Sequence, residues 1–236
     1  MFYDPGYMLV AIVGMALVFI PQMLVKGTFS KFSKVLAQKG LTGEQVAKNI
    51  LSDAGVHDVS VEPTKGTLSD HYDPTKKVIR LSEEIYYGNS VAALGVAAHE
   101  VGHAIQDNRG YLPMKLRAGI FPAVQTGQML GPILLMAGLG LRYFMGMGGF
   151  TDLIAITGIV LYGAVVAFHF ITLPVELNAS HRAMQALAGG GYLVQNEIGG
   201  AKKVLSAAAM TYIAVALYAL IELLYWVWVL FGRNRD

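Results

Sequence analysis

The chain of 236 residues contains no cysteine, which excludes both a disulfide framework and a thiolate zinc site. Any metal ion must therefore be held by histidine, aspartate or glutamate. Charge is scarce as well: charged residues make up 14% of the chain, and the net charge is +2. Because this charge is small and the sequence has no RNA-binding motif of aromatic and basic residues, we expect no nucleic-acid partner.

Apolar residues are abundant, at 54% of the sequence, and the mean hydropathy is +0.48. Such values are typical of membrane proteins and not of soluble domains. Four apolar runs are each long enough to cross a hydrocarbon core: Tyr7–Val25, Gly119–Tyr143, Leu153–Leu173 and Leu205–Phe231. We therefore expect an α-helical membrane protein with about four transmembrane helices.

Local features refine this expectation for three of the runs. No lysine or arginine precedes the first run and no small-residue cleavage pattern follows it, so we interpret it as a retained anchor. In the second run, Gly127 and Gly131 form a GxxxG pattern, which predicts close approach of another helix. Glu222 lies inside the fourth run, where a carboxylate is functional by default. The alternatives without a function are that it reaches the membrane interface near Trp226 or pairs with Arg142.

Most of the charge lies between the first and second runs, in residues 26–117, which have the pattern of a small α+β domain. Thr42 and Gln45 form a capping box for a helix that should end near Asp53. The other predicted elements are a helix over 28–38, strands over 56–62 and 76–82, a loop over 68–74, and a helix over 91–106 capped by Asn89 or Ser90. A free edge of the second strand would suit an extended substrate peptide, although a structural hairpin fits the pattern equally well.

The helix over 91–106 carries the residues on which the functional prediction depends. His99 and His103 are four residues apart, so they project from one face of the helix. That spacing suits two ligands of one Zn²⁺, and Glu100 is placed to act as general base on a zinc-activated water. This is the HExxH arrangement of zinc hydrolases, and a surface helix with two solvated histidines is the simpler alternative.

A catalytic zinc site needs a third protein ligand. Two predicted spans separate His103 from Pro174, so both lie on the same side of the membrane, and Glu176 is the best candidate. His181 is the rival ligand, and the alternative without a metal is that Glu176 is an interfacial charge. Two histidines, one glutamate and one open position would hold one Zn²⁺ per chain in a catalytic site.

These features divide the chain into five predicted segments. They are an N-terminal anchor (1–25), a zincin-like peptidase domain at the membrane surface (26–117), a transmembrane hairpin (118–173), a segment with the third ligand (174–203) and a C-terminal transmembrane helix (204–236). Lysine and arginine are absent before the first run but frequent next to the spans in the second and fourth segments, which predicts a site that faces the cytoplasm. Arg233 and Arg235 count mildly against this orientation.

Several stretches together resemble the bacterial YugP-like membrane zinc metallopeptidases: His71–Pro74, Ile79–Ser82, Ala98–Gln106, Pro174–Glu176 and Ala179–Ser180. The resemblance covers nearly the whole chain, and the family is similar to glutamate-type zinc peptidases such as the HtpX-like and CAAX-prenyl peptidases. It implies that the two histidines and Glu176 bind zinc and that Glu100 is the base. In the HtpX-like group the third-ligand helix reads E-x-x-A-D, and its aspartate orients a zinc histidine. Here Ser180 occupies that position, and Asn178 could share the role.

The sequence therefore predicts a membrane-embedded zinc peptidase of the bacterial inner membrane that hydrolyses peptides or membrane proteins at the bilayer surface. His181, Arg182, His71 and Tyr72 are the candidates to stabilise the oxyanion. One alternative is an intramembrane protease, for which the apolar run 91–105 is short. The other is a non-enzymatic scaffold in which zinc only fastens the soluble domain to Glu176.

Overall fold

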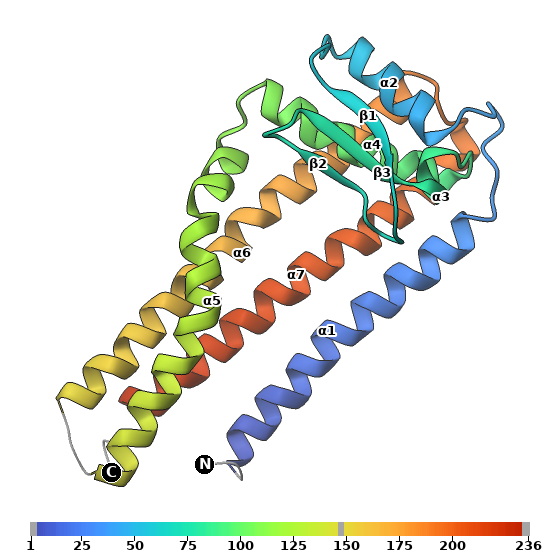
Figure 1. Ribbon diagram of the computed structural model, residues 1–236. Coiled ribbons are helices and arrows are strands. Elements are labelled where there is room, and N and C mark those ends of the chain that lie inside the picture. Colours follow the sequence, from blue (N-terminus) through green and yellow to red (C-terminus); the bar gives the residue numbers. More distant parts are fainter. Residues whose placement is uncertain (1–3, 146–148, 233–236) are drawn as a thin grey trace. The chain divides into compact units, whose positions relative to one another are not determined.

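The structure, a computed structural model, describes residues 4–145 and 149–232 (Figure 1). The helices in that part of the chain are α1 (Pro5–Phe32), α2 (Gly43–Asp53), α3 (Glu83–Tyr86), α4 (Val91–Asn108), α5 (Leu112–Met145), α6 (Phe150–Gly189) and α7 (Gln195–Phe231). The strands are β1 (Ser60–Thr64), β2 (His71–Asp73) and β3 (Val78–Ser82). Arg233 and Arg235 lie outside the described residues.

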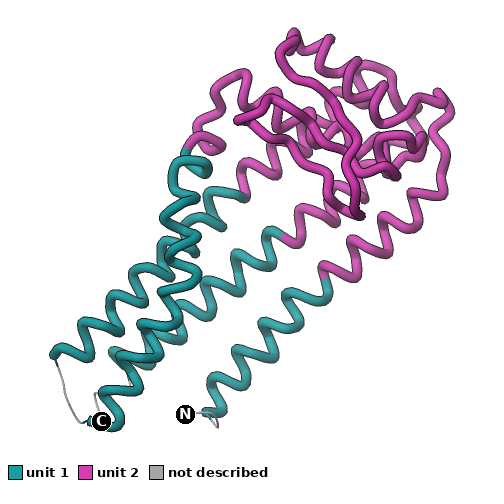
Figure 2. The backbone as a smooth tube through the Cα atoms, in the orientation of Figure 1, with its two compact units in different colours: residues 1–20, 116–172, 212–236 teal, residues 21–115, 173–211 magenta. Residues whose placement is uncertain are grey.

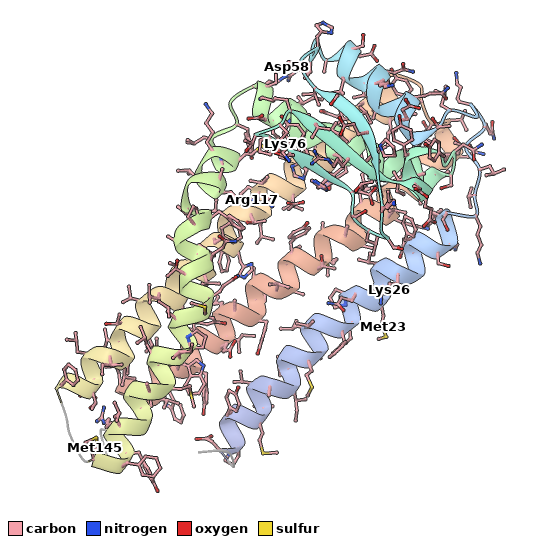
Figure 3. The ribbon with its side chains drawn as sticks, in the orientation of Figure 1. Met23, Lys26, Asp58, Lys76, Arg117 and Met145 are labelled. Carbon is pink, nitrogen blue, oxygen red and sulfur yellow. The ribbon has the colours of Figure 1, made fainter. Side chains whose placement is uncertain are left out.

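Four helices, α1, α5, α6 and α7, are long and apolar enough to cross a membrane. The chain is thus a helical membrane protein with a small α+β part, as predicted. The helices extend beyond the apolar runs. In α1 the apolar residues give way to Lys26, one turn after Met23 (Figure 3), and the helix then continues to Phe32. The separate helix predicted over 28–38 is therefore wrong, because its first half continues the membrane helix.

The chain forms two compact units, shown in Figure 2: unit 1 comprises residues 1–20, 116–172 and 212–236, and unit 2 comprises residues 21–115 and 173–211. In unit 1, α5 approaches α6 so closely that a Cβ atom on Gly127 would lie 2.9 Å from the carbonyl oxygen of Leu161. This contact confirms the close approach predicted from the GxxxG pattern.

Polar residues in unit 1 pair differently from the prediction. Glu222 accepts a hydrogen bond of 2.7 Å from the Tyr162 hydroxyl. Arg142 instead forms an ion pair of 2.8 Å with Asp152, which lies only ten residues further along the chain. The predicted pair of Arg142 and Glu222 is therefore wrong.

Unit 2 contains a three-stranded sheet in the order β1-β3-β2. β3 pairs in parallel with β1 and antiparallel with β2. Since β3 is the central strand, it has no free edge for a substrate peptide, and that expectation is wrong. Burial and proline agree with this order. Four of the five residues of β3 are buried in the structure, which is typical of a central strand, whereas Pro63 in β1 lacks an N–H donor and suits an edge.

Two further strand predictions need correction. β1 begins at Ser60 and not at Val56, and it continues through Pro63 to Thr64. β2 lies within the segment predicted as a loop, because three residues are too few to show an alternating pattern.

The helices of unit 2 begin as predicted. In α2, the Thr42 side chain accepts a hydrogen bond from the backbone of Gln45, and the Gln45 side chain accepts one from the backbone of Thr42. Ser90 caps α4 by accepting a hydrogen bond of 3.1 Å from the backbone N–H of Ala93. Helix α4 is buried along most of its length in a core shared with α2, β3 and α6.

Candidate metal centre

The two histidines of the motif lie on one face of α4. Their rings are 4.8 Å apart between centroids and nearly perpendicular, at 84°. Small neighbours such as Ala98 and Gly102 are buried against the rest of unit 2, so the helix is held tightly on the flanks of the histidines. The imidazoles are therefore fixed on a rigid element, which suits a preformed ligand pair.

Glu176 approaches the two histidines from α6. Helix α6 continues through Pro174 without a break, so Glu176 lies on the same helix as the third apolar run. One carboxylate oxygen, Oε2, lies 3.3 Å from Nε2 of His99 and 3.5 Å from Nε2 of His103. The Glu176 side chain is almost completely buried.

These three side chains fit a zinc ion. One ligand atom from each lies within 4.8 Å of the others. Two ligands at about 2.0–2.1 Å from a tetrahedral Zn²⁺ are about 3.3–3.4 Å apart, which matches the observed separations of the carboxylate from both imidazoles. Histidine nitrogen and carboxylate oxygen are also ordinary zinc ligands. The three ligand atoms thus converge on a space that one ion would share.

Gln106 determines which nitrogen of His103 faces the cluster. Its amide nitrogen donates to the backbone oxygen of Val175 at 2.7 Å and to Oδ1 of Asn178 at 3.1 Å. Because a backbone carbonyl can only accept, the amide oxygen of Gln106 must point to His103, 3.0 Å from Nδ1. Nδ1 of His103 therefore carries the proton, and the lone pair of Nε2 is directed at the cluster.

Ser180 plays the corresponding part for His99. Its hydroxyl oxygen lies 3.2 Å from Nδ1 of His99, and it follows Glu176 by one helical turn. Asn178 does not bond a histidine directly. Its Oδ1 atom accepts hydrogen bonds from Gln106 and from Nε of Arg182, at 3.1 and 2.8 Å.

Glu100 is buried, with 8% of its surface exposed, and it forms no side-chain hydrogen bond with any residue in the described part of the chain. Among the same residues, no fully buried side-chain oxygen lacks a partner, so the carboxylate oxygens of Glu100 must keep contact with solvent. A carboxylate that is shielded by protein and still open to water is suited to take a proton from a water molecule.

The electrostatics of His103 reflect these two acidic neighbours. Burial by itself would lower the pKa of His103, but the hydrogen bond to Glu176 and the charges of Glu100 and Glu176 outweigh burial and raise it. The site thus favours positive charge at its centre. A divalent cation would satisfy the same preference.

The remaining predicted residues lie elsewhere or have other partners. His181 is exposed on α6. On β2, Tyr72 donates a hydrogen bond of 2.7 Å to Asp107, and Nδ1 of His71 lies 2.7 Å from the backbone oxygen of Ser69. These hydrogen bonds thus fasten β2 to α4 through Tyr72 and to its preceding loop through His71.

Gln106 has a role in the site that the HExxH pattern does not include, although its spacing from His103 is a signal. It follows His103 by three residues, which places both on one side of the helix. It is also completely buried, which is uncommon for a glutamine without a structural partner. Helix α4 itself is not among the four candidate spans found in residues 4–145 and 149–232.

Comparison with known proteins places the chain in a family. Residues 7–231 match the family described as "Putative neutral zinc metallopeptidase". The chain is also 47% identical over 230 residues to the "Putative membrane protease YugP" of Bacillus subtilis (strain 168), with 98% of each protein covered. The chain therefore belongs to this zinc metallopeptidase family, whose relative is named a membrane protease. No solved structure matches it.

Proposed function

We propose that the protein is a zinc-dependent endopeptidase or exopeptidase that hydrolyses peptide bonds of peptides or membrane proteins at the membrane surface. His99, His103 and Glu176 would hold one Zn²⁺ per chain, and Glu100 would be the general base. The observation that carries the proposal is the convergence of two imidazoles and a buried carboxylate beside a second, unpaired carboxylate. Membership of the zinc metallopeptidase family supports it.

The chemistry divides between the ion and the chain. When bound, zinc would polarise the scissile carbonyl and lower the pKa of the attacking water. Glu100 would take a proton from that water on its exposed carboxylate oxygen and transfer it to the leaving amine. Gln106 and Ser180 would keep both histidines in the orientation that directs Nε2 to the ion.

The substrate is proposed to bind along β2. The edges of the sheet are β1 and β2, because β3 lies between them. Of the two, β2 packs against α4, which carries the motif, and the Tyr72 hydroxyl fastens it there through Asp107. An extended peptide could add to the free side of β2 through main-chain hydrogen bonds. The basic residues Lys26, Lys31 and Lys34 next to the first span support a cytoplasmic location of this site in the inner membrane.

The test separates metal binding from turnover. Full-length protein in lipid nanodiscs is incubated with a mixture of peptides from a membrane-protein digest, and cleavage products are identified by mass spectrometry. We expect the wild type to cleave some of these peptides and to carry about one zinc per chain. Glu100→Gln should keep the zinc and lose cleavage, whereas the surface control Glu83→Gln should keep both.

Two results would count against the proposal. Undiminished cleavage by Glu100→Gln would remove Glu100 from the role of base. A wild type that binds zinc but cleaves no peptide would favour the scaffold, in which zinc only fastens Glu176 to the two histidines.

A further inference from the structure

Unit 2 contains a pocket with a volume of about 420 Å³ between α2, α4 and α6. Apolar side chains contribute much of its lining: Ile50, Ala54, Ile105 and Ala186. Ile50 and Ile105 are themselves buried core residues, so this apolar surface is part of the fixed framework of the unit.

The pocket is separate from the metal centre. Arg109 caps the C-terminus of α4 and lines the pocket; it follows His103 by six residues, which is about 120° around the helix axis. The tight contact between Gly102 of α4 and Ala179 of α6 occupies the interface of the same two helices. No residue of the metal cluster lines the pocket within the described chain.

Two arginines contribute positive charge to the pocket. Arg109 is exposed and forms no ion pair among residues 4–145 and 149–232. Arg182 is held at Nε by Asn178, at 2.8 Å, so its terminal nitrogens are available to a ligand. One acidic residue, Asp53, shares the lining, and one of its carboxylate oxygens is occupied by the Tyr192 hydroxyl. The lining therefore carries a net positive charge.

We propose that this pocket binds the free C-terminal carboxylate of a peptide whose last side chain is apolar. Guanidinium groups bind carboxylates through paired N–H donors, and Arg182 is already oriented by Asn178. The apolar surface of Ile50, Ile105 and Ala186 would receive the terminal side chain. Binding of the peptide in this pocket does not depend on the proposed peptidase activity.

The position along α6 favours a peptide over a lipid headgroup. Arg182 lies nine residues after Leu173, where the third apolar run ends, and the pocket extends further to Gly189. At a rise of 1.5 Å per residue, Arg182 is about 14 Å along the helix axis from Leu173. The headgroup layer on each side of a bilayer is only about 5–8 Å thick.

The test uses the full chain in detergent micelles and a fluorescein-labelled peptide ending in Gly-Ala-Leu with a free carboxylate. The matched probe is the same peptide with a C-terminal amide. Fluorescence anisotropy is measured before and after removal of metal with a chelator, since a zinc ion could itself bind a carboxylate. We expect the free carboxylate to bind at least about tenfold more tightly than the amide, in both states of the protein.

Variants identify the pocket. Arg109→Gln and Arg182→Gln should each remove most of the preference for the carboxylate, while the exposed control Lys39→Gln should keep it. Arg109 is exposed, so its substitution should change the pocket and leave the folded core intact. Equal binding of carboxylate and amide would overturn the proposal, as would a preference that disappears with the metal or survives in Arg109→Gln. Displacement of the probe by phosphatidylglycerol but not by an unlabelled Gly-Ala-Leu peptide would also overturn it in favour of a lipid.

Discussion

Gly102 of α4 lies directly against the backbone of Ala179 of α6: a Cβ atom on Gly102 would be 2.6 Å from the carbonyl oxygen of Ala179. Only glycine allows this approach, and it occurs one residue before His103 and three residues after Glu176. The contact therefore sets the spacing of the two helices at the level of the metal cluster.

The first prediction follows from that contact. Gly102→Ala should destabilise the protein by about 1–3 kcal/mol, because the backbone of α6 must move to accept the methyl group. The displaced helix should also weaken zinc binding. Thermal unfolding in detergent and the zinc content measured by mass spectrometry would check both effects.

Gly95 provides the matched control on the same helix. A Cβ atom there would meet Ala201 at 3.8 Å, which is ordinary van der Waals contact. Gly95→Ala should therefore be neutral or stabilising by up to about 1 kcal/mol. If both variants unfolded at the same temperature, the tight approach at Gly102 would not be what spaces the helices.

The second prediction concerns Gln106, whose amide oxygen accepts the hydrogen bond from Nδ1 of His103. Gln106→Ala should reduce zinc affinity about 10–100-fold, because the imidazole loses the acceptor that orients it. The free energy of unfolding should also fall by about 1–3 kcal/mol, because the backbone oxygen of Val175 and the side chain of Asn178 lose a donor. Competition with a fluorescent zinc chelator measures the affinity. An unchanged zinc affinity in a folded variant would contradict this role.

The third prediction concerns Ser180, whose hydroxyl lies beside His99. Ser180→Ala should lower zinc affinity, by up to about tenfold, because Nδ1 of His99 loses its partner. Ser180→Asp should raise the affinity above that of the wild type, since a carboxylate accepts the same hydrogen bond with a negative charge. If the aspartate variant bound zinc more weakly than the alanine variant, the hydroxyl would not act as an acceptor for His99.

The fourth prediction concerns removal of the metal. A ligand that binds only the folded state at a concentration 1,000 times its Kd stabilises that state by about 4 kcal/mol. Chelation should therefore lower the unfolding temperature of the wild type clearly. Glu176→Ala should show the lower temperature already, and chelator should change it little. If neither zinc nor chelator changed the unfolding temperature of the wild type, the assignment of His99, His103 and Glu176 as zinc ligands would be contradicted.

The fifth prediction is a loss of stability at alkaline pH. Burial and the hydrogen bond to Asp53 raise the pKa of Tyr192 to about 12, from an ordinary value of about 10. A raised pKa in the folded state contributes stability that is complete below pH 10 and is lost as the pH rises towards 12. Unfolding temperatures at pH 8 and pH 11 should therefore differ less for Tyr192→Phe than for the wild type. Tyr87→Phe, at an exposed tyrosine, should behave like the wild type in this respect.

The sequence predicted those elements whose signals are local and repeated. The four spans followed from long apolar runs, and the start of α2 followed from Thr42 and Gln45. The fold class was predicted correctly for the same reason. Strand order was not predictable, because β1 and β3 pair in parallel across the chain segment that contains β2. The short β2 has no periodicity of its own, so the free edge was assigned to the wrong strand.

At the candidate site, the spacing of residues within one helix predicted which side chains lie together, whereas side-chain contacts between helices could not be predicted from the sequence. The i and i+4 positions of His99 and His103 placed them together, and topology placed Glu176 on their side of the membrane. The hydrogen bonds of Gln106 to Val175 and Asn178 span about 70 residues of chain and leave no local pattern. The partner of Arg142 is likewise a residue of the following helix, Asp152, and composition does not reveal that pairing.

The distance along the chain between His99 and Glu176 is 77 residues, and two membrane crossings lie within it. The ribosome therefore synthesises His99, Glu100 and His103 well before it synthesises Glu176. During that interval the nascent chain holds an incomplete ligand set. The ligand set can therefore be completed only after α5 and the first part of α6 have been synthesised.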